Sequence, residues 1–454
     1  MKKLFFFAAL AAAVLTSCVK THDTHKYTSP GDAVSFGVYV PQTKAVSATD
    51  FGGMTTNILG KYDNKGFGVF AYYTDNADFS VESKPNFMYN QQVNGDGTGY
   101  APSTWTYSPI KYWPNEHGTN AASTHVDKLS FFAYAPWVDA LDKAAGTVKD
   151  GNGSAATEGI TAMTGNNTAG YPTLTFTIPA KGEEQIDLLW AVAPTSPLNE
   201  NAQGTPANSV VAGFPWMDLT KQQCDGKVHF LFKHALAKLD FKVQAIVDDP
   251  SSATNAIAAG SKVFVRKVEV FGNFAKTNTL NLRNTTANIP NWGTPTVSAS
   301  VTGDPAFIFN DGLDDTDDST ADADESADIA AAFVNGAGVT NAAQKLLVAD
   351  HEFLIIPTDL RDGETPGGGI KVRITYDVET ADNNLAGTLT DGSTNGIKVK
   401  NVITTTTPAY LNIEGGKVYT ITLKLGLTSV KMEAEVDDWG ANTDATVNLP
   451  QNVA

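Results

Sequence analysis

The sequence predicts an all-β protein with a few short helices. Three observations predict this fold class: apolar residues alternate with polar ones along many short segments, clusters of Gly, Asn, Asp, Ser and Pro separate these segments, and helical patterns are scarce. Alternation with period two is typical of strands that place one face on a core. Many short strands joined by turns favour β-sandwiches.

The expected strands extend from the start of the chain to its end. Near the start, Val34, Phe36, Val38 and Val40 alternate with smaller or polar residues. Further strands are expected at residues 67–73, 129–134, 174–178, 228–232, 239–243, 263–271, 370–376, 410–413, 419–425 and 432–436. Short helices are expected at residues 138–148, 328–333 and 342–348.

The length and one polar stretch predict the domain organisation. A chain of 454 residues is long enough for two or three domains. A polar stretch follows Pro215-Trp216, and a new series of strands starts at Val228, so we expect a boundary near residues 222–226. We therefore expect an N-terminal β-sandwich domain over residues 34–222 and a C-terminal one over residues 226–454.

The first eighteen residues have the pattern of an export signal. A basic start, Met1-Lys2-Lys3, precedes an apolar run from Leu4 to Leu15 that is shorter than the roughly 20 residues of a membrane-spanning helix. The run ends in Leu15-Thr16-Ser17-Cys18, which resembles the lipobox of bacterial lipoproteins. We therefore expect a signal peptide over residues 1–17, cleavage between Ser17 and Cys18, lipidation of Cys18 and a polar tether over residues 18–33.

Two acyl chains or more on Cys18 would hold the protein durably at a membrane, since a single chain binds only marginally. The alternative is an ordinary signal peptide that Cys18 merely follows. The second cysteine, Cys224, has no partner if Cys18 carries lipid, so we expect no internal disulfide.

The net charge and the absence of known motifs argue against several classes of function. A formal net charge of −17 without a Lys/Arg cluster argues against a nucleic-acid partner. No G-x-S-x-G, H-E-x-x-H, C-x-x-C, P-loop or G-x-G-x-x-G fingerprint is present, so we expect no enzyme, no cofactor and no metal site. The Asp-rich residues 311–328 lack the ligand order of a calcium loop and are expected to form a solvated loop.

The aromatic residues near position 110 and His234 each have two competing interpretations. Trp105, Tyr107, Tyr112 and Trp113 alternate as on a strand pair, and core packing is the favoured reading; the alternative is an exposed platform that stacks on sugar rings. His234 lies among apolar neighbours without a second His or Cys at metal spacing, which favours a core histidine over a metal ligand.

Several segments together resemble one family. These are residues 86–91 (NFMYNQ), 105–115 (WTYSPIKYWPN), 127–136 (DKLSFFAYAP), 232–239 (FKHALAKL) and 436–439 (VDDW), in this order and behind the lipobox. In motifs, order and spacing the chain resembles the Bacteroidales fimbrillin family, the type V pilins. The resemblance covers most of the chain after the signal peptide.

The resemblance implies a structural fimbrial subunit of two tandem transthyretin-like β-sandwich domains. Similar proteins reach the outer membrane as lipoproteins and lose their first strand to a trypsin-like, usually arginine-specific, surface protease. A neighbouring subunit's terminal strand then fills the opened groove, as in other β-strand additions. The implied partners are other fimbrial subunits, the outer membrane through the lipid, the protease, and surface ligands on host or bacterial cells during adhesion.

This chain contains parts that match those roles. The first strand, Val34 to Val40, precedes Lys44-Ala45, the candidate processing site; an arginine-only protease could not cut there, and the chain has no Arg before Arg266. The candidate donor strand carries alternating apolar residues near the other end, namely Met432, Ala434, Val436, Val447 and Leu449. Alternatively, this strand completes its own sandwich. The alternative function is an outer-membrane lipoprotein that binds glycans at the cell surface.

Overall fold

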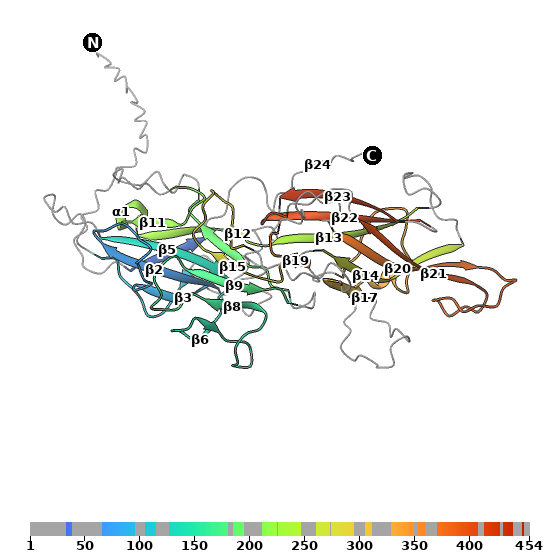
Figure 1. Cartoon of the computed structure of the whole chain (residues 1–454), viewed down its shortest axis with the longest axis horizontal. Helices are drawn as coiled ribbons and strands as arrows, with labels where there is room; N and C mark the ends of the chain where they lie inside the picture. Colours follow the sequence, from blue (N-terminus) through green and yellow to red (C-terminus); the bar gives the residue numbers. More distant parts are fainter. Residues whose placement is uncertain are drawn as a thin grey trace, which may run out of the picture.

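The computed structural model describes residues 33–38, 66–95, 105–114, 127–179, 185–194, 211–224, 226–246, 260–272, 274–294, 305–310, 328–348, 353–358, 370–406, 413–426, 430–438 and 447–448. Within these residues the protein is almost entirely β-structure, which confirms the predicted all-β fold class. The sheets are arranged along an elongated molecule, with β2, β5 and β9 in one half and β13, β20 and β22 in the other (Figure 1).

Two sheets are built mainly from the first half of the chain. The first has the strand order β1-β12-β10-β5-β2-β3-β4, with β11 also paired to β5. Its strands are β1 (Ser35–Val38), β2 (Phe67–Asp75), β3 (Met88–Gly95), β4 (Trp105–Thr106), β5 (Lys128–Ala135), β10 (Leu189–Val192), β11 (Trp216–Leu219) and β12 (Lys227–His234). The second has the order β16-β15-β9-β8-β7-β6. Its strands are β6 (Ala140–Asp142), β7 (Thr147–Val148), β8 (Gly159–Met163), β9 (Thr173–Thr177), β15 (Thr277–Asn281) and β16 (Asn291–Trp292).

Two further sheets come from the second half. One has the order β18-β13-β22-β23-β24, with β19 also paired to β13, and the other has the order β17-β14-β20-β21. The strands of the former are β13 (Ala237–Ala245), β18 (Gln344–Lys345), β19 (Phe353–Ile355), β22 (Lys417–Leu425), β23 (Val430–Asp438) and β24 (Val447–Asn448). Those of the latter are β14 (Ser261–Phe271), β17 (Phe307–Asn310), β20 (Lys371–Ala381) and β21 (Gly396–Thr406).

Helical structure is limited, in the described residues, to the one-turn helix α1 (Lys221–Cys224) and the 3₁₀ turn η3 (Ala331–Phe333). The helix predicted at residues 138–148 is wrong, because β6 and β7 form a hairpin there. Gly146 adopts φ +75° in this turn, and a Cβ at this position would lie 1.8 Å from the Met163 carbonyl oxygen. The helix predicted at residues 342–348 is also wrong, since this segment pairs with β13 through β18.

Strand pairing crosses the boundary predicted at residues 222–226. The strand β12 lies after that boundary, yet it pairs with β1 and β10 in the first sheet. The change of sheet falls instead at Ala235-Leu236, which separate β12 from β13. Strands β15 and β16 also return to pair next to β9 in the second sheet. The sequence pattern marks each strand but not its partner, so it could not locate this crossing.

The central strands of the first sheet are buried on both faces. Phe67 and Val69 of β2 point into one hydrophobic cluster, whereas Phe70 and Tyr72 of the same strand belong to another. This explains why the segment is almost continuously apolar instead of alternating. The first sheet is therefore a middle layer, with one core around β1 and a second core that continues into the other sheets.

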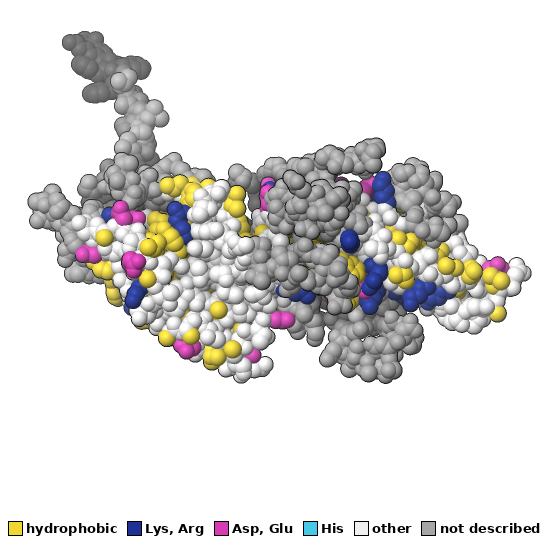
Figure 2. All heavy atoms as spheres, in the orientation of Figure 1, with side chains coloured by type: hydrophobic (Ala, Val, Ile, Leu, Met, Phe, Trp, Pro, Cys, Tyr) yellow, Lys and Arg dark blue, Asp and Glu magenta, His cyan; other side chains and the backbone are white. Residues whose placement is uncertain are grey.

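The strand β21 lies at an edge of its sheet. It pairs with β20 over its whole length, and its other side has no strand partner in the described part of the chain. Ile397, Val399 and Val402 are exposed on it, and dark-blue Lys and Arg side chains lie among the yellow ones at this end of the molecule (Figure 2). Lys398 and Lys400 in the same strand provide the charge that commonly protects an edge from unwanted pairing.

The core of the second half gives a stability prediction. Phe353 is 1% exposed and its ring contacts those of Phe241, Phe307 and Phe309. We expect Phe353→Ala to lower the free energy of unfolding by about 3–5 kcal/mol, because it leaves a cavity among these rings. Urea denaturation followed by circular dichroism measures this, with Ile308→Ala as the control, since Ile308 is exposed on β17. A loss as small as that of the control would contradict this account of the core.

Candidate functional site: the seat of the first strand

The four-residue strand β1 pairs along one edge with β12, and Val34, the residue directly before it, is hydrogen-bonded on the other side. On one edge it runs parallel to β12, with Phe36 aligned to Val228. On the other edge, the Val34 amide donates to the Lys111 carbonyl oxygen at 2.9 Å. The Tyr107 hydroxyl donates to the Val34 carbonyl oxygen at 2.7 Å. The strand therefore lies between two partners and forms part of the wall of the first core.

We call the parts of the chain that hold β1, namely β12, Tyr107 and Lys111, the β1 seat. The Phe36 side chain lies at its centre. It is 1% exposed and its ring centroid lies 5.4–6.3 Å from those of Phe67, Tyr107, Phe131 and Phe230. These four rings come from β2, the segment after β4, β5 and β12, so one side chain joins four parts of the fold. Removal of β1 would leave an apolar groove with an aromatic pocket in its floor.

The other face of β1 leaves no room for a side chain at Gly37. A Cβ at this position would lie 2.6 Å from His229 Cδ2 and 2.8 Å from Lys227 Cε. Any strand in this seat must therefore carry glycine, or displace these two side chains, directly after its large buried residue. An isolated glycine inside a strand pattern often marks such a close approach.

The side chains of Trp113 and Tyr107 form hydrogen bonds at the end of the seat where β1 begins. The Trp113 indole donates to the Gly226 carbonyl oxygen at 3.0 Å, and the Ser35 amide donates to the same oxygen at 3.2 Å. Burial raises the pKa of the Tyr107 hydroxyl, and the hydrogen bond from the Lys111 amide opposes this rise. Tyr107 therefore stays protonated as the donor to Val34.

The predicted core role of the aromatic block is confirmed for most of its members. Tyr107 is 8% and Trp113 is 3% exposed, and Trp105 packs against Phe67 with 5.0 Å between the ring centroids. Tyr112 is the exposed exception, at 54%. The reading of the block as an open platform for sugars is therefore wrong for the two buried rings.

The candidate donor strand is paired within its own sheet. All nine residues of β23 align with β22, from Val430 opposite Leu425 to Asp438 opposite Lys417. Met432 is 4% exposed, whereas Ala434 and Val436 are half-buried. The strand β24 adds a two-residue pairing, in which Val447 lies opposite Val436. In the isolated subunit β23 thus completes its own sheet, which was the alternative expectation.

His234 is a core histidine, as predicted. It is 5% exposed, and its Nδ1 lies 2.7 Å from Oδ2 of the buried Asp187. The sequence pattern around His234 does not indicate this partner, since 47 residues separate the two in the chain. Cys224 is buried, and its Sγ lies 3.6 Å from the Lys221 carbonyl oxygen.

Several predicted positions lie outside the described residues: Ser17, Cys18, Val40, Lys44, Ala45 and Leu449, and the acidic residues 311–328 except Asp328. They stay predictions. Within the residues that the structure describes, no helix is long and apolar enough to cross a membrane. Those same residues contain no group of three or more His, Cys, Asp or Glu side chains that could hold a metal ion.

Known proteins similar to this chain are fimbrial. No protein-family model matches it. It is 23% identical over 452 residues to the fimbrium subunit Fim1C of Phocaeicola vulgatus, and the match covers 97% of each chain. This confirms the resemblance to the Bacteroidales fimbrillins. The relative is a fimbrial subunit, which agrees with the prediction of a structural protein and not an enzyme.

A solved structure supports the same fold. A fimbrial protein from Bacteroides vulgatus superimposes with a TM-score of 0.56 at 19% identity, covering 90% of this chain and 99% of that one. A fimbrilin from Porphyromonas gingivalis covers 90% of this chain and 96% of its own, but its TM-score of 0.32 and 10% identity are too low to bear on the fold.

The packing around Phe36 predicts that Phe36→Ala weakens the docking of β1. We expect this change to weaken the docking of β1 by about 3–5 kcal/mol, because the Phe36 ring fills the pocket between four others. Hydrogen exchange measures the effect at the Val34 amide, which is bonded to Lys111. The control is Val38→Ala at the half-buried end of the strand. Unchanged protection of Val34 in Phe36→Ala would refute the role of the ring.

His229 predicts a pH dependence of stability. Burial first, and Lys227 second, lower the pKa of His229 in the folded protein. The unfolded state then binds the proton more readily, so the free energy of unfolding decreases as pH falls through the unfolded pKa of about 6.5. We expect His229→Gln to remove this part of the decrease. Urea midpoints of both proteins across this range measure it, and a constant difference between the two curves would count against it.

Proposed function

We propose that this chain is a structural subunit of a cell-surface fimbria and that it joins its neighbours by exchange of β1. The fimbrial relative supports the first part. One structural observation carries the second: a four-residue strand pairs with β12, is tied at Val34 to Lys111 on the other side, and places Phe36 in an aromatic pocket. A strand of this kind can be replaced by another that makes the same bonds.

The energetics favour replacement over an empty groove. Loss of β1 exposes the apolar surface that Val34 and Phe36 cover, at a cost of roughly 1.5–3 kcal/mol for each large side chain. It also leaves the Lys111 carbonyl and the β12 backbone without their β1 partners. An incoming strand with alternating apolar residues recovers both contributions, so neighbouring subunits associate through main-chain bonds and matched side chains.

The donor in this proposal is the segment that follows Asp438 and includes Val447 and Leu449. Withdrawing β23 would break a nine-residue pairing with β22 and expose Met432. Withdrawing β24 breaks only the two-residue pairing with β23. The shorter pairing is the less costly one to exchange, because backbone bonds and buried area both scale with its length.

The proposal includes export and processing. Cys18 carries the lipid that holds the precursor at the outer membrane, and a trypsin-like protease cuts between Lys44 and Ala45. That cut separates both β1 and the lipidated Cys18 from the rest of the chain. Processing thus couples release from the membrane to opening of the groove. Assembly of subunits then produces a fimbria for adhesion, with surface ligands on host or bacterial cells as further partners.

A selective cut tests this proposal. The chain has no Arg before Arg266, so Lys44→Arg creates a site for an arginine-specific protease within the first 265 residues, and Lys44→Gln is the matched control. After treatment with this protease, we expect Lys44→Arg protein to form heat-stable ladders on gels, while wild type and Lys44→Gln, which it cannot cut near residue 44, stay monomeric. A peptide of residues 33–40 should block the ladders, and its Phe36→Ala form should block them less, because it cannot fill the pocket.

Two outcomes would contradict this mechanism. Cut protein that loses residues 1–44 and stays monomeric would exclude strand exchange from the β1 seat. Ladders that form equally well in the presence of the peptide would show that subunits join at another surface. Labelled palmitate separately tests the anchor, since Cys18→Ala should abolish labelling.

A further inference from the structure

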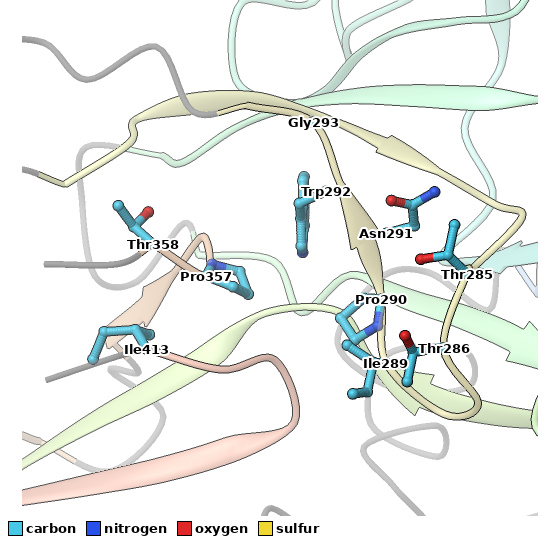
Figure 3. Close-up of a pocket in the computed structure, with 10 residues that line it drawn as sticks. All are labelled: Thr285, Thr286, Ile289, Pro290, Asn291, Trp292, Gly293, Pro357, Thr358 and Ile413. Atoms are coloured by element: carbon cyan, nitrogen blue, oxygen red, sulfur yellow. The ribbon is translucent and has the colours of Figure 1, made fainter. Parts of the chain in front are cut away.

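A pocket of about 290 Å³ lies away from the residues of the β1 seat. Its walls come from the turn between β15 and β16, from β16 itself, and from the segments after β19 and before β22. The lining includes Thr285, Thr286, Asn291, Trp292, Pro357 and Thr358 (Figure 3). The pocket therefore lies between β16 of the second sheet and two loops of the sheet that contains β13 and β22.

Hydrogen bonds to the backbone hold three side chains of the pocket in place. The Trp292 indole donates to the Ala235 carbonyl oxygen at 2.9 Å. The Asn291 amide donates to the Arg283 carbonyl oxygen at 2.8 Å. The Thr358 hydroxyl donates to a backbone carbonyl oxygen at 2.9 Å. The pocket is thus formed before any ligand binds, which lowers the entropic cost of binding.

Among the described residues, none that lines the pocket carries a charge. This is notable in a chain with a net charge of −17. A charged ligand would lose water here without meeting an opposite charge, which is unfavourable. The lining therefore selects a neutral ligand.

The lining combines an aromatic ring with neutral hydrogen-bonding groups. The Trp292 N–H is already bonded to Ala235 and the ring is only partly buried, so the indole offers a ligand apolar surface. Figure 3 shows this ring edge-on, with Pro357 and Thr358 on one side and Asn291 and Thr285 on the other. The hydroxyls of Thr285 and Thr286, both exposed, and the amide of Asn291 can donate and accept hydrogen bonds.

We propose that this pocket binds one neutral sugar ring of a glycan. A sugar ring has apolar C–H groups on its faces, which pack on an aromatic ring, and hydroxyls around its rim, which bond to threonine and asparagine. The volume lies at the lower limit of ligand pockets, which suits a single ring with the rest of the glycan outside. This site differs from the buried aromatic block, and it does not depend on strand exchange.

The test uses the full chain and a panel of free sugars. The neutral probes are glucose, galactose, mannose and N-acetylglucosamine, and the charged probes are glucuronic acid and glucosamine. Saturation-transfer NMR detects binding, and titration gives the affinity. We expect at least one neutral sugar to bind and Trp292→Phe to weaken its binding severalfold, since the phenyl ring is smaller than the indole and lacks the N–H that bonds to Ala235 and orients the ring.

The matched control is Trp137→Phe. Trp137 is also a half-buried tryptophan whose indole donates to a backbone carbonyl, that of Asn90, at 3.1 Å, but it does not line the pocket. This variant should bind as wild type does. If Trp292→Phe does not fold, Thr286→Trp provides the test, because it fills the pocket from an exposed position.

Three results would overturn the proposal. The first is that no neutral sugar shows saturation transfer. The second is that sugar binding survives Thr286→Trp unchanged. The third is that the charged sugars, or a proline-rich peptide added as a competitor, bind this pocket in preference to the neutral sugars.

Discussion

The packing of Phe36 among four aromatic rings is the contact on which the first sheet depends. The rings belong to Phe67, Tyr107, Phe131 and Phe230, which are far apart in the sequence and come together only when their strands pair. Each ring buries a large apolar area. A short strand with few backbone bonds is consequently held mainly by one side chain. That division of the binding energy suits the strand exchange proposed above.

The two cores are connected through strands buried on both faces. β2 and β5 contribute residues to the cluster around Phe36 and also to the larger cluster that reaches the other sheets. A groove opened at β1 would therefore have a rigid floor, because the opposite face of the same strands stays packed. Subunits joined at such a groove would form a stiff contact, as a fibre requires.

Predictions from the sequence succeeded where they depended on local pattern. Alternation located β1, β12, β13, β22 and β23, and apolar neighbours identified His234 as a core residue. They failed where the result depended on distant partners. The segment 138–148 has a helical pattern, but Gly146 and pairing with β8 make it a hairpin. The close approach of His229 and Lys227 to Gly37 was missed, although a lone glycine in a strand was a usable signal.

The sequence by itself determined the all-β class, the alternating strands near both ends and the fimbrial resemblance, because period-two patterns and short motifs are properties of neighbouring residues. Only the tertiary structure decided which strands pair. It placed β12 with β1, kept β23 in its own sheet, and brought Trp292 together with neutral side chains around a pocket. The physical reason is that strand pairing and packing select among many partners with equivalent backbone groups, and this choice is made by contacts between residues distant in the chain.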